Sequence, residues 1–257
     1  MHIYMALEGR RYWPKWLRNW CQHSEEKRLK KYLEEYNQVK VKEDNQAARV
    51  KYLELSVELR RFPLDYKGNP NVNYPTRLGN LLSAYEDYPL RSYGMDSFFY
   101  WYRIWLAIDE DLREHIDTQQ ALADSSVYMT VALFFTALIL TAYALIQQMG
   151  IRLITPFPTS KLLLFSAFFS MFLSWLLYRA SLHLHATFGE LYKSMFDMHR
   201  DKVSVDDVID RVYFLTKDES IKNASSSEKY IIAWRYLHNY KIKTKDGVVS
   251  VATLDSD

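Results

Sequence analysis

The feature of this sequence that most limits its fold is a run without a single charged side chain, from Val127 to Ile146. A helix rises about 1.5 Å per residue, so a run of about twenty residues matches the roughly 30 Å hydrocarbon core of a membrane. A second run, from Lys161 to Tyr178, is charged only at its first residue and is near the lower limit for crossing. Lys161 and Arg179 can extend toward the headgroups. We therefore predict two membrane-spanning helices.

The segment between these runs, residues 147–160, contains Gly150, Pro156 and Pro158. Proline cannot continue a helix, so we expect the two spans to form a hairpin joined by a short loop. Two buried helices of a soluble protein are the alternative interpretation. Lysine and arginine are fewer in the loop than after the second span, and the side of a membrane richer in these residues is normally the cytoplasm. We therefore expect both termini to be cytoplasmic.

The rest of the chain is predicted to be helical, so the expected fold class is all-α: a transmembrane helical hairpin with a cytoplasmic helical domain. We divide the sequence into an interfacial segment (1–23), a cytoplasmic helical domain (24–125), the hairpin (126–179) and a juxtamembrane helix with a C-terminal helical part (180–257). Residues 24–61 lack glycine and proline and predict a charged helix with Ser24 as its N-cap. Residues 63–75 are rich in proline and asparagine and predict a loop, after which Thr76 should cap the next helix.

Further helices are expected on both sides of the hairpin. Residues 97–112 are apolar and aromatic almost all round, so this helix should be buried or lie at the membrane interface. No helix breaker follows the second span before Gly189, so that helix should project beyond the bilayer. Ser204 begins a sequence that resembles a capping box, and residues 225–240 predict a final amphipathic helix. The tail after it should be a short strand or disordered.

Tryptophan is concentrated near the start of the chain. Trp13, Trp16 and Trp20 share one face of a predicted helix and have arginine and lysine around them. An aromatic face with basic flanks can lie at the headgroup layer of a membrane, so these three residues are a candidate interfacial anchor. The alternative is a tryptophan-rich helix that packs against its own domain.

The second span carries three serines at intervals of four. Ser166, Ser170 and Ser174 therefore lie on one face of the helix. Small residues at this spacing let two helices approach closely, so we expect this face to pack against the first span. The alternative is an oligomer in which the hydroxyl groups line a pore.

Several classes of function lack their usual residues in this chain. Cys21 is the only cysteine, so a disulfide within the chain and a zinc site built on several thiolates are excluded. The formal charge is +2 with no basic tract, which argues against nucleic acid as a partner. His183 and His185 are too close in sequence to share a helix face, and no phosphate-binding loop or nucleophile motif is present. We therefore expect no cofactor, no metal and no enzymatic activity.

Two blocks of short motifs flank the hairpin. The first contains Thr76-Arg77-Leu78-Gly79-Asn80, then Glu86-Asp87-Tyr88, then Arg91-Ser92-Tyr93-Gly94-Met95-Asp96; the second contains Phe188-Gly189-Glu190-Leu191 and Phe196-Asp197 followed by Arg200. In this order, over roughly residues 8–203, they resemble the motifs of an uncharacterised prokaryotic family of two-span membrane proteins. The resemblance implies a two-span protein with a cytoplasmic helical region, and it implies no particular activity. Ser92 departs from the family pattern.

The polar residues of the two blocks are the candidate site. They are Arg77, Asn80, Glu86, Arg91, Asp96, Glu190, Asp197 and Arg200. Their charges are complementary, so we predict that the blocks meet just under the cytoplasmic leaflet, with Gly79 and Gly189 allowing close approach. The favoured interpretation is an ion-pair network that fixes the domain to the hairpin. A site for a lipid headgroup or another ligand is the alternative.

The function expected from these features is that of a non-enzymatic membrane anchor or subunit. Its partners would be membrane lipids and either a cytoplasmic protein that it recruits into a membrane assembly or further copies of itself. One alternative is an oligomerising, pore-like effector that perturbs the membrane, for example in prokaryotic defence. Another is a protein that binds or modifies lipid headgroups.

Overall fold

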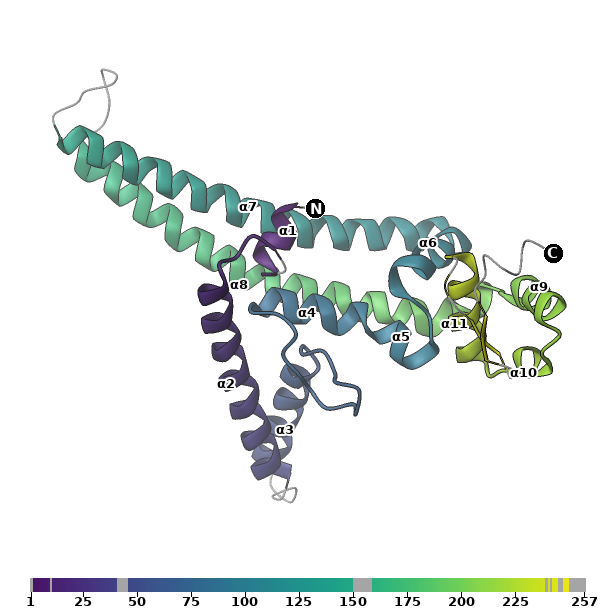
Figure 1. The fold of residues 1–257 in the computed structure, drawn as a ribbon. Helices are drawn as coiled ribbons and strands as arrows, with labels where there is room; N and C mark the ends of the chain where they lie inside the picture. Colours follow the sequence, from purple (N-terminus) through teal and green to yellow (C-terminus); the bar gives the residue numbers. More distant parts are fainter. Residues whose placement is uncertain are drawn as a thin grey trace.

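The computed structural model describes residues 2–9, 11–40, 46–149, 159–238, 240, 242–244 and 247–249. These residues are helical except for loops and a short terminal β-hairpin, so the fold class is all-α as predicted. The central feature is a pair of long antiparallel helices, α7 (Glu110–Gln148) and α8 (Ser160–His199) (Figure 1). Each contains one predicted span, and both are long and apolar enough to cross a membrane.

Small residues recur every seven positions along the line where α7 and α8 meet. The members of this small-residue seam, all at most 7% exposed, are Ala123, Thr130, Ala137 and Ala144 on α7 and Ala167, Ser174 and Ser181 on α8. A seven-residue spacing keeps the same side of a helix facing its partner when the two helices supercoil slightly. The Ser174 hydroxyl donates to the Thr130 carbonyl at 2.8 Å, which fixes the register. In this antiparallel register, Ala137, seven residues after Thr130, comes opposite Ala167, seven residues before Ser174.

The predicted serine face of the second span lies on this side of α8. Ser174 belongs to the seam, and Ser166 and Ser170 are half-buried beside it. On α7 the hydroxyl of Thr141 donates to the Ala137 carbonyl of its own helix at 2.8 Å. The small side chains therefore let the two backbones approach closely over the whole length of the apolar runs.

The segments from α4 onward, other than the pair itself, gather around one half of the α7–α8 pair and form with it a helical domain (Figure 1). The helices of this domain are α4 (Arg77–Glu86), α5 (Tyr88–Tyr93), α6 (Ser97–Ala107), the 3-10 turn η1 (Arg200–Lys202), α9 (Asp206–Thr216), α10 (Glu219–Lys222) and α11 (Ser226–Leu237), followed by the antiparallel strands β1 (Ile242–Thr244) and β2 (Gly247–Val249). Tyr100, Ile104 and Phe196 are fully buried in the main core, which joins α6 to the outer part of α8.

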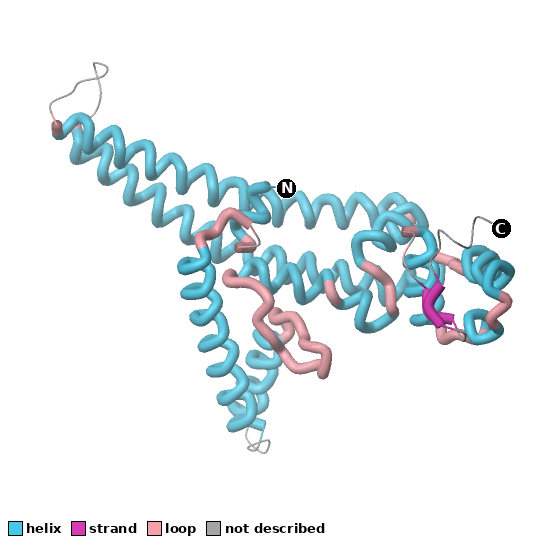
Figure 2. Tube along the Cα trace, in the orientation of Figure 1, coloured by secondary structure: helices cyan, strands magenta, loops and turns pink. Residues whose placement is uncertain are grey.

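The first helices form an arm that projects to one side from the middle of the pair. After the short helix α1 (His2–Leu7), α2 (Lys15–Lys40) runs outward and α3 (Gln46–Leu59) returns (Figure 1). Figure 2 shows the loop of residues 60–76 leading back from the arm to α4. A separate small core, built on Leu29 and Phe62, holds the arm together.

The other half of the pair, residues 131–148 of α7 and 160–175 of α8, is called here the bare half. Outside the seam most of its side chains are apolar, and many large ones are exposed, including Phe135, Phe165 and Trp175. Only 17% of the most apolar stretch of each helix is buried within the protein. The apolar runs are therefore not the core of the described domain, as they would be in a soluble protein built around two central helices.

Several predicted boundaries are corrected by the structure. The arm helix begins at Lys15 rather than at Ser24, because Pro14 directly precedes it and its carbonyl accepts from Arg18 N at 3.0 Å. The aromatic helix ends at Ala107 rather than at residue 112, and α7 begins at Glu110. Gly189 does not interrupt α8, which continues to His199.

The capping signals near the C-terminus also differ from the prediction. Among the described residues, Ser204 bonds to Asp206, the first residue of α9, and forms no capping box. A capping box occurs instead at α11, where Ser225 accepts from Glu228 N and the Glu228 carboxylate accepts from Ser225 N at 2.9 Å. Thr76 caps α4 as predicted, accepting from Gly79 N at 3.0 Å.

Candidate functional site

The two motif blocks meet where α4 packs on α8, and Gly189 lies at the contact. A Cβ atom at this position would lie 2.6 Å from Cδ1 of Tyr85, a buried residue of α4. The absence of a side chain therefore allows the Tyr85 ring to lie against the α8 backbone. Gly79 permits a different approach, because it faces the backbone of Glu8 at the end of α1.

Two tyrosines and one carboxylate link the blocks. The Tyr88 and Tyr93 hydroxyls donate to the same oxygen of Asp197, at 2.8 Å and 2.6 Å. The Arg200 guanidinium lies 4.6 Å from the centre of the Tyr93 ring, in a cation–π contact. Burial, together with the bond to Asp197, raises the pKa of Tyr88, so this phenol stays protonated and keeps donating.

The other charged residues of the blocks make separate contacts. Arg91 donates to the backbone carbonyls of Leu64 and Asp65 in the loop, and Asp96 caps α6 by accepting from Phe99 N at 2.9 Å. Glu190 pairs with Lys193 on its own helix at 2.9 Å. Glu86 is half-buried at the end of α4. These contacts correct the prediction of one ion-pair network, because the side chains point to different neighbours around α4, α5 and α8.

Asn80 is fully buried and organises the loop that enters α4. Its carbonyl oxygen accepts from Asn73 N at 3.0 Å and from Tyr74 N at 2.9 Å. Its amide donates to the carbonyls of Tyr74 at 2.9 Å and Thr76 at 3.0 Å. The side chain therefore uses its full hydrogen-bonding capacity to hold the loop closed.

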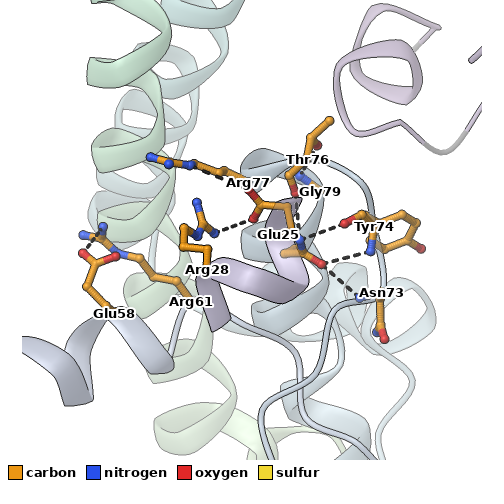
Figure 3. Close-up of polar contacts among 10 residues, drawn as sticks. Glu25, Arg28, Glu58, Arg61, Asn73, Tyr74, Thr76, Arg77 and Gly79 are labelled. Atoms are coloured by element: carbon orange, nitrogen blue, oxygen red, sulfur yellow. Dashed lines mark hydrogen bonds and ion pairs between the residues drawn. The ribbon is translucent and has the colours of Figure 1, made fainter. Parts of the chain in front are cut away.

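The arm attaches to the domain through a buried acid that the sequence did not single out. Glu25 of α2 lies 2.6 Å from Arg28 and 3.8 Å from Arg77 of α4, and Figure 3 shows the three side chains together. Burial raises the pKa of Glu25, while the two arginines and Asn80 oppose this shift. Glu25 is one of many charged residues on α2, so nothing in its sequence pattern distinguishes it.

A second polar contact holds α1 across the helix pair. The Tyr4 hydroxyl donates to Asp124 of α7 at 2.5 Å and lies 3.1 Å from Nε2 of the buried His185 of α8. Nδ1 of His185 lies 2.8 Å from the Ser181 carbonyl. Burial lowers the pKa of His185 and raises that of Tyr4. His185 therefore helps to position α1 against the helix pair. In the described part of the chain, no group of three histidine, cysteine, aspartate or glutamate side chains could hold a metal ion.

The three tryptophans of the candidate anchor lie in different environments. Trp16 and Trp20 are exposed on the first turns of α2, where the arm leaves the pair. Trp13 precedes the helix, is half-buried and donates its indole N–H to the Ala6 carbonyl at 2.6 Å. The exposed aromatic face therefore consists of Trp16 and Trp20, and Trp13 ties α1 to the start of the arm.

Replacing Asn80 with aspartate tests the role of this buried amide. The carboxylate has no N–H to offer the Tyr74 and Thr76 carbonyls, and each buried group left without a partner costs about 1–3 kcal/mol. We expect Asn80→Asp to lower the unfolding free energy by about 2–4 kcal/mol, measured by thermal and denaturant unfolding in detergent. Asn71→Asp, an exposed change in the same loop, is the control and should have little effect. Equal stability of the two variants would contradict the proposed role of Asn80.

Comparison with known proteins leaves the chain without a demonstrated relative, since no family model, curated protein or solved structure matches it. The resemblance to the two-span family therefore stays a prediction.

Proposed function

We propose that this chain is a two-span membrane anchor that holds a helical domain at the cytoplasmic face and recruits a protein partner there. The bare half carries the proposal. Its exposed side chains are mainly apolar on both helices, as shown by Ile139 at 67% and Phe168 at 71% exposure. A soluble protein rarely leaves so large an apolar surface uncovered, whereas a bilayer covers it at no cost.

The edge of the bare half has the residues expected at a headgroup layer. The Arg179 guanidinium lies 5.2 Å from the centre of the Trp175 ring at the end of the second span. Trp16 and Trp20 are exposed at the base of the arm. Aromatic and basic side chains favour the membrane–water boundary. This placement leaves the arm and the domain on one side of the membrane, and the excess of basic residues after the second span favours the cytoplasmic side.

The outward face of α6 is the surface proposed to recruit the partner. Phe98, Tyr102 and Leu106 recur every four residues and are 68–75% exposed, while Tyr100 and Ile104 on the opposite face are fully buried. α6 lies beside the start of α7, well away from the bare half (Figure 1), so a membrane around the bare half does not cover this stripe. An apolar stripe at this spacing fits the apolar face of a helix from a cytoplasmic protein.

A pore made from the serine face has less support. The Ser174 hydroxyl is already bonded to the Thr130 carbonyl within the same chain, and Ser166 and Ser170 lie beside the seam. The anchor is therefore preferred over the pore-like effector.

Arginine in the bare half should block membrane insertion. An arginine at the centre of a spanning helix costs about 2.5–3.5 kcal/mol on insertion. We expect the double variant Ile139→Arg, Phe168→Arg to lose most of its resistance to extraction from membranes by alkaline carbonate. Leu106→Arg on α6, which is equally exposed, should leave the resistance unchanged. Retention of the double variant in the membrane at the level of the unmodified chain would contradict the proposed spans.

Cross-linking from α6 tests the recruitment of a partner. A photoreactive amino acid at position 102 should give one discrete cross-linked product in intact cells, at a fixed ratio to the chain. The same group at Tyr66, an exposed loop tyrosine, should not give that product. A product with the mass of two chains would show that α6 binds a second copy of the chain and not a different protein. Identical cross-linking patterns from both positions would contradict recruitment by α6.

A further inference from the structure

A cavity of about 360 Å³ lies where the arm meets α4 and α8, and four arginines line it. Arg28 comes from α2, Arg61 follows α3, Arg77 begins α4 and Arg179 lies on α8. Figure 3 shows Arg28, Arg61 and Arg77 approaching the same space from three separate segments. Four guanidinium groups repel one another unless negative charge lies between them.

The carboxylates of the protein balance only part of this charge. Arg28 pairs with Glu25 and Arg61 pairs with Glu58, each at 2.6 Å. Arg77 reaches only Glu25, at 3.8 Å, and Arg179 pairs with no carboxylate of the described residues. The cluster of four arginines and two acids therefore keeps a surplus of two positive charges.

Two buried donors of the cluster also have no acceptor. The Nε groups of Arg28 and Arg61 are both buried without a hydrogen-bond partner. Buried polar groups are normally paired, so Arg28 and Arg61, which both line the cavity, each keep hydrogen-bonding capacity that the protein does not use. Burial also lowers the pKa of Arg28, because the charge is held away from water, although Glu25 opposes the shift.

An apolar groove lies next to this cavity on the bare half. It has a volume of about 590 Å³ and runs from Leu7 along α7 and α8 past Phe134, Phe168 and Trp175. Trp175 lines the groove, and the Arg179 guanidinium that lines the cavity lies 5.2 Å from its ring centre. A cationic cavity beside an apolar groove matches the two parts of a phospholipid, a charged headgroup and an acyl chain.

We propose that the arginine cavity binds a phosphate group of net negative charge, and that an anionic phospholipid supplies it, with an acyl chain lying in the groove. Guanidinium groups bind phosphate through paired N–H donors, which suits this cluster better than a lone point charge. The cavity contains Arg77 of the candidate site predicted from the sequence and no other member of it, so it is a different site from one built on Glu190 and Asp197. The lipid source rests on the proposed membrane placement, because the groove then lies in the hydrocarbon layer.

The test uses the full chain purified in detergent and titrated with water-soluble probes. They are short-chain dihexanoyl phosphatidic acid, the matching zwitterionic phosphatidylcholine, glycerol 3-phosphate and inorganic phosphate, each at equal ionic strength. We expect saturable binding and a rise in Tm with phosphatidic acid. Phosphatidylcholine should bind at least roughly tenfold more weakly because it lacks the net charge. Glycerol 3-phosphate and inorganic phosphate should also bind at least roughly tenfold more weakly, because they lack the acyl chains.

The double variant Arg77→Gln, Arg179→Gln should weaken phosphatidic acid binding by roughly tenfold or more, since it removes two charge-assisted contacts. Arg18→Gln with Arg103→Gln, two exposed arginines outside the cavity, is the matched control and should leave affinity unchanged. Arg179→Lys keeps the charge and loses the planar donor pair, so it should give an intermediate loss. If the double variant does not fold, Arg179→Gln alone takes its place.

The outcomes separate the two parts of the proposal. Glycerol 3-phosphate binding as tightly as phosphatidic acid would keep the phosphate site and overturn the lipid source. Equal affinity of a folded Arg77→Gln, Arg179→Gln protein, or no saturable binding to any phosphate probe, would overturn the site. Because short-chain lipid in detergent needs no bilayer, failure here is distinct from failure of the membrane-anchor proposal, which the carbonate extraction of Ile139→Arg, Phe168→Arg decides.

Discussion

Close contact between α7 and α8 through the small-residue seam is the constraint on which the rest of the structure depends. Alanine, serine and threonine every seven residues leave no bulk between the helices, and the bond from Ser174 to Thr130 sets their register. The part of α8 after Arg179 then provides the surface on which α4 and α6 pack. The Tyr4 hydroxyl of α1 contacts Asp124 of α7 and His185 of α8 at the same time. It can contact both because this register places the two side chains close together.

One continuous helix pair therefore serves two environments. After Arg179 the domain packs on α8, and before Asp124 the exposed side chains of α7 are mainly polar. The remaining parts of both helices carry mainly apolar exposed side chains. The arm leaves the pair at this boundary, and it brings Arg28 and Arg61 to Arg77 and Arg179. In the proposed placement, the boundary of the bare half is also the headgroup layer. The same geometry would then fix the depth of the protein and position an arginine cavity for an anionic headgroup.

The sequence was sufficient for features that depend on local chemistry. The uncharged runs predicted both long apolar helices, and the Thr76 hydroxyl predicted the start of α4. Of the predicted serine face, Ser174 bonds to α7. The sequence was insufficient for contacts that depend on how distant segments of the chain pack together. Nothing in the sequence near Glu25 indicates that it would be buried against Arg77. The charges of the two blocks are complementary in sign, but in the fold the charged side chains mainly contact other residues rather than one another. The seven-residue spacing of Ala123, Thr130, Ala137 and Ala144 is present in the sequence, whereas the predicted packing face rested on the four-residue spacing of the serines.

Thiol labelling from each side of the membrane tests whether the hairpin crosses it, because Cys21 is the only cysteine of the sequence and lies on the arm. Two further proteins would carry Cys21→Ser with either Ser220→Cys in the domain or Ser160→Cys at the far end of α8. The account predicts that a membrane-impermeant maleimide reaches Cys21 and position 220 from the cytoplasmic side only, and position 160 from the opposite side only. Labelling of position 160 from the same side as Cys21 would show that the hairpin does not cross, and would contradict the account.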